Sequence, residues 1–159
     1  MSRRKGFTLV ELLVAATIIS ILLVFATVKY RSSAAETRWN HAKVYAGQLA
    51  NAMQRAKLDY TKLQFSGDMA NQTSLSTTDC PYTPWIENAD VRTLIPCGYL
   101  ENGPWQDGYF TYYACEQGGD ACPANALACV SVKATARLPD DYKKYKYCVW
   151  TDKSQEFYE

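Results

Sequence analysis

One carboxylate, Glu11, lies within an otherwise apolar or small run of 22 residues that extends from Phe7 to Val28. A helix of this length rises about 33 Å, which is enough to cross the hydrocarbon core of a bilayer. A charged side chain at the centre of such a helix costs about 2.5–3.5 kcal/mol, and less near an end. A buried carboxylate becomes tolerable when an ammonium and hydrogen bonds satisfy it. We therefore expect Glu11 to require a partner.

All six cysteines follow this apolar run, and their even number predicts disulfides in an oxidising compartment. They are Cys80, Cys97, Cys115, Cys122, Cys129 and Cys148. No two of them have the two-residue spacing of a zinc knuckle or a thioredoxin-like motif, and the single histidine, His41, lies far upstream. We predict no metal site and no cofactor. No acid pair or nucleophile motif stands out, so we also predict that the protein is not an enzyme.

The segment that contains Glu11 resembles the cleavage and methylation site of type IV pilins and of the pseudopilins of type II secretion. Its sequence is Lys5-Gly6-Phe7-Thr8-Leu9-Val10-Glu11-Leu12. The resemblance implies that prepilin peptidase, on the cytoplasmic side of the inner membrane, cuts after Gly6 and methylates the new amino terminus on Phe7. It also implies that Glu11 pairs with the terminal amine of a neighbouring subunit. We expect Thr8 to donate a further hydrogen bond.

A secretory signal or an ordinary membrane anchor would also contain an apolar run. A signal has an apolar core of roughly 7–15 residues followed by a small-residue cleavage site, whereas here the core is longer and the Ala-rich positions lie inside it. An anchor needs neither Glu11 nor the Gly6–Phe7 junction. The chain departs from many pilins at Ser20 and Val28, where those members have glycine and proline. This departure makes a minor subunit or a pseudopilin more plausible.

The charge distribution predicts a single-pass precursor in the inner membrane with a periplasmic carboxyl-terminal domain. The leader, residues 1–6, is basic, as expected of a cytoplasmic flank, although Lys29 and Arg31 weaken the asymmetry. Loss of the leader reduces the 17 basic side chains to 14, against 16 acidic ones, for a net charge of −2. Nucleic acid is therefore not an expected partner. The mature protein is expected in a pilus at the cell surface or in a periplasmic pseudopilus.

The apolar half of the helix, residues 7–28, is expected to continue as an amphipathic half over residues 29–65. Apolar residues recur there at alternating four- and three-residue steps, which places them on one stripe. The stripe consists of Ala35, Trp39, Ala42, Ala46, Leu49, Met53, Ala56, Tyr60 and Leu63. Its small alanines favour packing on a sheet over a coiled-coil seam. Ser66-Gly67-Asp68 predicts that the helix ends near Leu63 to Phe65.

Residues 66–108 have the composition of a loop region. Two stretches near its end, Leu94–Leu100 and Gly103–Tyr112, are similar to the segment that leads into the first strand of major pseudopilins and related pilins. A generic turn into a strand accounts for them nearly as well. Trp105 is expected at the edge of the sheet. Asn71-Gln72-Thr73 matches a glycosylation acceptor, but such triplets are common in polar loops.

Strand-like runs at about 109–116, 127–137 and 145–151 predict an antiparallel meander within a sheet region of residues 109–159. The expected fold is therefore α+β and pilin-like, with a long helix on a small disulfide-stapled sheet. A hairpin near Leu138-Pro139 would place Cys129 opposite Cys148. Six cysteines allow 15 connectivities. Our first choice joins Cys80 to Cys97, Cys115 to Cys122 and Cys129 to Cys148, while a hairpin centred on Cys122 would instead place Cys115 opposite Cys129.

Two sets of residues could instead bind a ligand. Asp120, Asp140 and Asp141 are candidate calcium ligands, but acids in turns are usually solvated, and no spaced set of oxygen ligands is visible. Residues 142–147, Tyr-Lys-Lys-Tyr-Lys-Tyr, have a composition that binds single-stranded nucleic acid. A strand with its aromatic residues in the core and its lysines in water is the preferred interpretation.

The sequence thus predicts a structural subunit that forms a homo-oligomer or co-assembles with other pilins in a helical filament. The alternatives are a type II secretion pseudopilin and a minor pilin for DNA uptake or adhesion.

Overall fold

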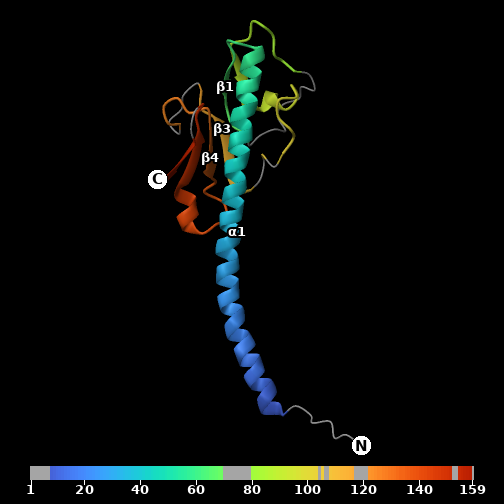
Figure 1. Cartoon of the computed structure of the whole chain (residues 1–159), viewed down its shortest axis with the longest axis vertical. Coiled ribbons are helices and arrows are strands. Elements are labelled where there is room, and N and C mark those ends of the chain that lie inside the picture. Colours follow the sequence, from blue (N-terminus) through green and yellow to red (C-terminus); the bar gives the residue numbers. More distant parts are fainter. Residues whose placement is uncertain are drawn as a thin grey trace, which may run out of the picture. The chain divides into compact units, whose positions relative to one another are not determined.

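The structure, a computed structural model, describes residues 8–69, 80–103, 105, 108–116, 122–151 and 154–158. The chain has an α+β fold with one long helix, α1 (Leu9–Asp59), and a small antiparallel sheet (Figure 1). It divides into two compact units, Met1–Thr37 and Arg38–Glu159. In the described part of the first unit, the chain is helical from Leu9 onward.

The helix ends earlier than the sequence predicts. It stops at Asp59, and Gln64–Ser66, expected in its last turn or just after it, forms strand β1. This strand pairs in parallel with β2 (Asn88–Asp90), with Phe65 aligned to Ala89. The expected end near Leu63 to Phe65 is therefore wrong, because hydrogen bonds to a distant segment take these residues out of the helix.

The stripe predicted for the second half of the helix is confirmed as its buried face. From Trp39 to Ala56 each stripe residue is at most 3% exposed, and Leu63, beyond the end of the helix, is 1% exposed. Trp39 lies 5.8 Å from Phe110 and 6.1 Å from Tyr145, measured between ring centroids. Ala42, Ala46 and Ala56 on the same face are also buried, each at most 1% exposed. The second unit is built on this contact.

The main sheet has four antiparallel strands in the order β3-β4-β5-β6. They are β3 (Phe110–Ala114), β4 (Ala128–Val132), β5 (Tyr145–Val149) and β6 (Ser154–Tyr158). The three predicted strands are present, but the second is shorter than expected, because Lys133 and Ala136 close a turn after Val132. The fourth strand, β6, was not predicted. Its pairing with β5 makes β5 an interior strand.

The region between β1 and β3 contains more order than its loop composition suggests. Besides β2 it forms a short 3-10 helix, η2 (Val91–Leu94), with Val91 and Leu94 fully buried. Trp105, expected at the sheet edge, packs on Tyr112 of the edge strand β3 and on Tyr45 of α1, with ring centroids at 5.4 and 5.6 Å. It is 1% exposed, so this segment contributes a large side chain to the core.

A buried carboxylate joins three elements of the second unit. Glu116, just after β3, accepts a hydrogen bond from the backbone N–H of Phe65 in β1 at 2.9 Å. Its second oxygen, Oε1, is buried, and the only group facing it among the described residues is the ammonium of Lys57 on α1. The Glu116 side chain is 6% exposed and that of Lys57 is 34% exposed. The end of α1, β1 and the end of β3 are thus connected through one side chain.

We predict that Lys57→Met lowers the free energy of unfolding by about 2–3 kcal/mol, because it leaves the Glu116 carboxylate buried without a cation. Lys62→Met is the matched control. Lys62 is exposed and makes no ion pair within the described part of the chain, so its replacement should change stability by less than about 0.5 kcal/mol. Urea unfolding of the full-length protein in detergent, followed by near-ultraviolet circular dichroism, measures both values. Equal effects of the two substitutions would contradict the role given to Glu116.

Candidate functional site

Thr8 and Glu11 form a reciprocal cap at the amino terminus of α1. Glu11 Oε2 accepts hydrogen bonds from the backbone N–H of Thr8 at 2.8 Å and from its hydroxyl at 2.9 Å. The N–H of Glu11 donates to the Thr8 hydroxyl oxygen at 3.2 Å. This is the capping-box arrangement, in which a threonine and a glutamate three residues later satisfy helix N–H groups. The structure therefore brings Thr8 and Glu11 together within one chain.

The other carboxylate oxygen of Glu11 has no hydrogen-bond donor among the described residues. Glu11 is exposed. The capping box thus fixes the orientation of the carboxylate and uses one oxygen, while the second remains available to a cation from outside the chain. Cleavage after Gly6 would leave the Thr8 N–H and hydroxyl in place.

From Leu9 to Thr27 the helix presents apolar side chains on every face, and all of them are exposed. Its hydroxyls are satisfied locally. Thr17 donates to the carbonyl of Val14 at 2.7 Å and Ser20 to that of Ala16 at 2.8 Å. Within the described residues, α1 is the one helix that is long and apolar enough to cross a membrane. Because its backbone and hydroxyl groups bond internally, this segment suits a bilayer or a bundle of apolar helices.

Several residues singled out from the sequence lie outside the described part of the chain. They are the cleavage residues Gly6 and Phe7, the triplet Asn71-Gln72-Thr73, and Asp120. Their roles remain predictions.

All six cysteines form disulfides in the structure. The bridges are Cys80–Cys97, Cys115–Cys122 and Cys129–Cys148, and no cysteine is free. These are the pairs chosen first from the sequence. Cys129 and Cys148 are direct partners across β4 and β5, as a hairpin after β4 requires. A group of three sulfurs, from Cys115, Cys122 and Cys129, lies close enough to resemble a metal cluster, but each of these sulfurs already belongs to a bridge.

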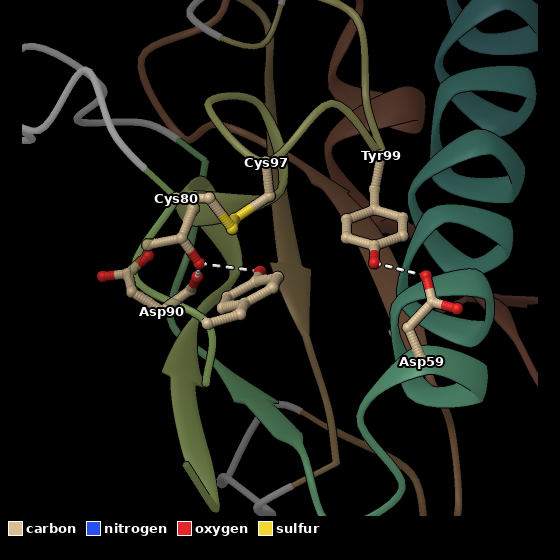
Figure 2. The surroundings of a disulfide bond; sticks show 7 residues. Asp59, Cys80, Asp90, Cys97 and Tyr99 are labelled. Carbon is tan, nitrogen blue, oxygen red and sulfur yellow. Dashed lines mark hydrogen bonds between the residues drawn. A yellow bond between two sulfur atoms is a disulfide. The ribbon is translucent and has the colours of Figure 1, made fainter. Parts of the chain in front are cut away.

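The Cys80–Cys97 bridge fastens the segment before β2 to the segment after η2. Figure 2 shows Tyr99, two residues beyond this bridge, directed toward Asp59 at the end of α1, where its hydroxyl donates a hydrogen bond to the carboxylate. This hydrogen bond, with a smaller effect of burial, raises the pKa of Tyr99 to about 12. Arg55 of α1 also donates to the backbone carbonyl of Tyr99 at 2.9 Å. The loop is therefore anchored to α1 at Asp59 and Arg55.

Asp90 organises the same region from the other side. Its carboxylate accepts from the backbone N–H of Arg92 at 2.9 Å and from Arg92 Nε at 2.8 Å, which caps η2. Burial raises the pKa of Asp90, but the hydrogen bonds from Arg92 and its positive charge outweigh burial, so the pKa lies below its usual value. Asp90 therefore stays ionised in weak acid, and the cap would be lost only as the pH falls through this lowered pKa.

The Tyr-Lys segment, residues 142–147, does not form the continuous strand expected of it. Its first half belongs to the 3-10 helix η3 (Asp140–Lys144), where Lys143 and Lys144 are exposed. In β5, Tyr145 and Tyr147 are half-buried toward α1, as expected, but Lys146 is only 8% exposed, which contradicts the expected solvent-facing lysine. Because β6 makes β5 an interior strand, Lys146 lies between two neighbours in the sheet, aligned with Ser131 of β4 and Phe157 of β6.

The two candidate calcium ligands in η3, Asp140 and Asp141, are not arranged as a metal site among the described residues. Asp140 accepts a hydrogen bond from Lys143 Nζ at 2.8 Å, and this contact lowers the pKa of Asp140. Among the described residues, Asp140 and Asp141 belong to no group of acidic, histidine or cysteine side chains placed to hold a metal.

Sequence reasoning missed the anchoring residues of the second unit. Glu116, Asp59 and Arg55 each bind a segment far away in sequence, and none of them stands out by spacing or pattern. A groove of about 970 Å³ between α1 and residues 98–103, which Arg55 and Tyr99 help to line, was also not foreseen. For Asp59 and Arg55 the available signal was weak, because they are charged residues beside the predicted apolar stripe, and Glu116 lies outside the helix.

Comparison with known protein families gives one match. Residues 1–27 match the family model described as the prokaryotic N-terminal methylation motif, which is the prepilin signal of type IV pilins and pseudopilins. The match covers the leader and most of the apolar run, including Gly6, Phe7, Thr8 and Glu11. Comparisons with curated proteins and with solved structures give no match. The matched motif therefore includes Thr8 and Glu11, the two residues that form the capping box at the start of α1.

We predict that Thr8→Val weakens the first turn of α1 by about 1 kcal/mol, because the valine loses both hydroxyl hydrogen bonds of the cap. Amide hydrogen exchange of residues 9–12, measured on the full-length protein in detergent micelles, should become roughly fivefold faster. Thr17→Val is the control, since the Thr17 hydroxyl bonds only the Val14 carbonyl in mid-helix. Unchanged exchange in Thr8→Val would show that the capping box does not hold the helix start.

Proposed function

We propose that this chain, which carries the N-terminal methylation motif of a type IV pilin-like or pseudopilin precursor, is a structural subunit of a type IV pilus or pilus-like filament. The observation that carries the proposal is the combination of this motif with an exposed apolar helical segment, Leu9–Thr27, that contains a single carboxylate. The motif implies a structural protein. We assign no catalytic group to the chain.

Maturation begins in the inner membrane, which the apolar helix and the motif suit. Prepilin peptidase cuts after Gly6 and methylates Phe7. The carboxyl-terminal domain lies in the periplasm, where three disulfides can form and persist. The processed subunit then leaves the bilayer for the filament.

Assembly exchanges lipid for the apolar helices of other subunits. The exposed side chains of Leu9 to Thr27 supply the contact area, and repetition of one head-to-tail contact builds an open fibre. Glu11 fixes the register. Its capping box orients the carboxylate, and the oxygen that the cap leaves unused accepts the methylated amine of an incoming Phe7. The pair offsets the cost of placing either charge in an apolar bundle.

We predict that Glu11→Gln and Glu11→Val both abolish incorporation into filaments, while cleavage after Gly6 continues. Glutamine keeps an oxygen that can accept the Thr8 hydrogen bonds, but it carries no charge. Valine removes both the charge and the cap. Loss of the ion pair leaves an ammonium unpaired in an apolar environment, at a cost of about 3–5 kcal/mol, which corresponds to at least a hundredfold loss of incorporation. The test expresses each variant as the sole copy and compares membrane-bound with filament-bound protein.

The two variants separate the roles of the carboxylate. Normal incorporation of Glu11→Gln together with failure of Glu11→Val would show that only the helix cap matters, and the proposed ion pair would be wrong. Normal incorporation of both would remove Glu11 from assembly altogether. Thr8→Val is the matched control, because it weakens the cap but leaves the charge, so it should reduce incorporation far less than Glu11→Gln.

A further inference from the structure

Two disulfides in the second unit touch each other. The Sγ atoms of Cys115 and Cys129, which belong to different bridges, are 3.2 Å apart. The sulfur of Cys122 also lies within 4.8 Å of both. The four sulfurs therefore form a chain of contacts in the order 122, 115, 129, 148, with a covalent bond at each end and a non-bonded contact in the middle.

Strand register explains why these bridges meet. Cys129 in β4 is aligned with Cys148 in β5 on one side and with Tyr113 in β3 on the other. Cys115 lies two residues beyond Tyr113 and continues the ladder through its N–H, which donates to the carbonyl of Leu127 at 2.8 Å. Cys115 and Cys129 thus point to the same face of the sheet as diagonal neighbours. This is the face that points away from α1.

The four cysteines differ in their exposure to solvent. Cys129 and Cys148 are fully buried and Cys115 is 4% exposed, within a cluster covered in part by Trp150. Cys122 is only half-buried. Trp150 is held over the cluster by a hydrogen bond from its indole N–H to the carbonyl of Ala124 at 3.0 Å. A thiolate in solution can therefore reach Cys122 more easily than the other three sulfurs.

We propose that Cys122 is an entry site for thiol–disulfide exchange, through which an external thiolate shifts the sheet from its two native bridges to a Cys115–Cys129 bridge. The thiolate attacks Cys122 Sγ, forms a mixed disulfide there and releases Cys115 as a thiolate. The Cys115 thiolate then attacks Cys129 Sγ, with which it is already in contact, and releases Cys148 as a thiolate that takes a proton from water. One external thiol is consumed and one protein thiol appears, so no net oxidation or reduction occurs.

The exchange changes which strands are covalently joined. In the native arrangement Cys129–Cys148 joins β4 to β5. In the rearranged state Cys115–Cys129 joins the end of β3 to β4, and β5 keeps its hydrogen bonds and its packing on α1 but is no longer joined to β4 by a disulfide. The Cys80–Cys97 bridge takes no part, because among the described residues neither of its sulfurs belongs to the close group. The protein thus has two covalent forms of the same sheet.

The test treats the full-length protein in detergent with reduced glutathione and then quenches it with acid and N-ethylmaleimide. Digestion with chymotrypsin and with a protease that cuts after glutamate separates all four cysteines, because Tyr113, Glu116, Leu127 and Tyr147 lie between or beside them. Mass spectrometry without reduction then identifies the bridges. The expected products are glutathione on Cys122, a Cys115–Cys129 bridge, and maleimide on Cys148 at least as much as on Cys115. Maleimide confined to Cys115, with Cys129–Cys148 intact, would overturn the proposal.

Cys122→Ala tests the second step without any added thiol. In this variant Cys115 has lost its partner, and we expect a Cys115–Cys129 bridge with Cys148 as the free thiol. A free thiol found only on Cys115 would overturn the proposal. Cys97→Ala is the matched control, because it frees Cys80 away from the sulfur group. It should retain both Cys115–Cys122 and Cys129–Cys148. A Cys115–Cys129 bridge in this control would mean that any free thiol in the sample scrambles the sheet, and it too would overturn the proposal.

Discussion

The first half of α1 exposes apolar side chains around its whole circumference, and water is a poor solvent for such a surface. Nothing in the described part of the first unit covers it. The segment from Leu9 to Thr27 must therefore be covered either by lipid or by other helices. Its backbone and hydroxyl groups bond internally, so both environments accept it. Glu11 is the exception, because the cap supplied by Thr8 satisfies only one carboxylate oxygen. In the proposed assembly, transfer of a subunit from the bilayer into a bundle of like helices would bring the methylated amine of a neighbouring subunit to this free oxygen.

The second unit depends on a different interaction, the packing of the buried face of α1 on a small sheet. That face includes alanines such as Ala42, Ala46 and Ala56, and the ring of Trp39 on it contacts Phe110. A domain of this size buries limited apolar area, and small exported domains commonly add disulfides for this reason. Here the bridges secure the irregular segments and the β4–β5 pair, while the Glu116 carboxylate joins α1, β1 and the end of β3. Two of the bridges lie in contact through Cys115 and Cys129. This contact is the basis for the proposed thiol–disulfide exchange between them.

Sequence reasoning succeeded where a period or a turn dictates structure. The four- and three-residue steps from Trp39 to Ala56 predicted the buried face of α1, and the turn at Leu138-Pro139 placed Cys129 across from Cys148. It failed where pairing is non-local. β1 and β2 have three residues each, and neither Gln64–Ser66 nor Asn88–Asp90 shows a strand pattern on its own. The polar start of β6 hid the fourth strand, and with it the interior position of β5, the strand that contains the buried Lys146. For the candidate site, the lone charge in an apolar run and the resemblance to a prepilin site singled out Glu11, with Thr8 as a further hydrogen-bond donor, but only the structure shows that the two residues cap their own helix.

Mass spectrometry of filaments sheared from the cell surface would show whether the chain is a processed filament subunit. We expect this chain to be present in them, to begin at N-methylated Phe7, and to have all six cysteines oxidised. A chain found only in the membrane fraction and still beginning at Met1 would contradict the claim. A chain cut after Ala15 or Ala16 would contradict it as well, because the apolar run would then be a secretory signal and Glu11 would leave with it.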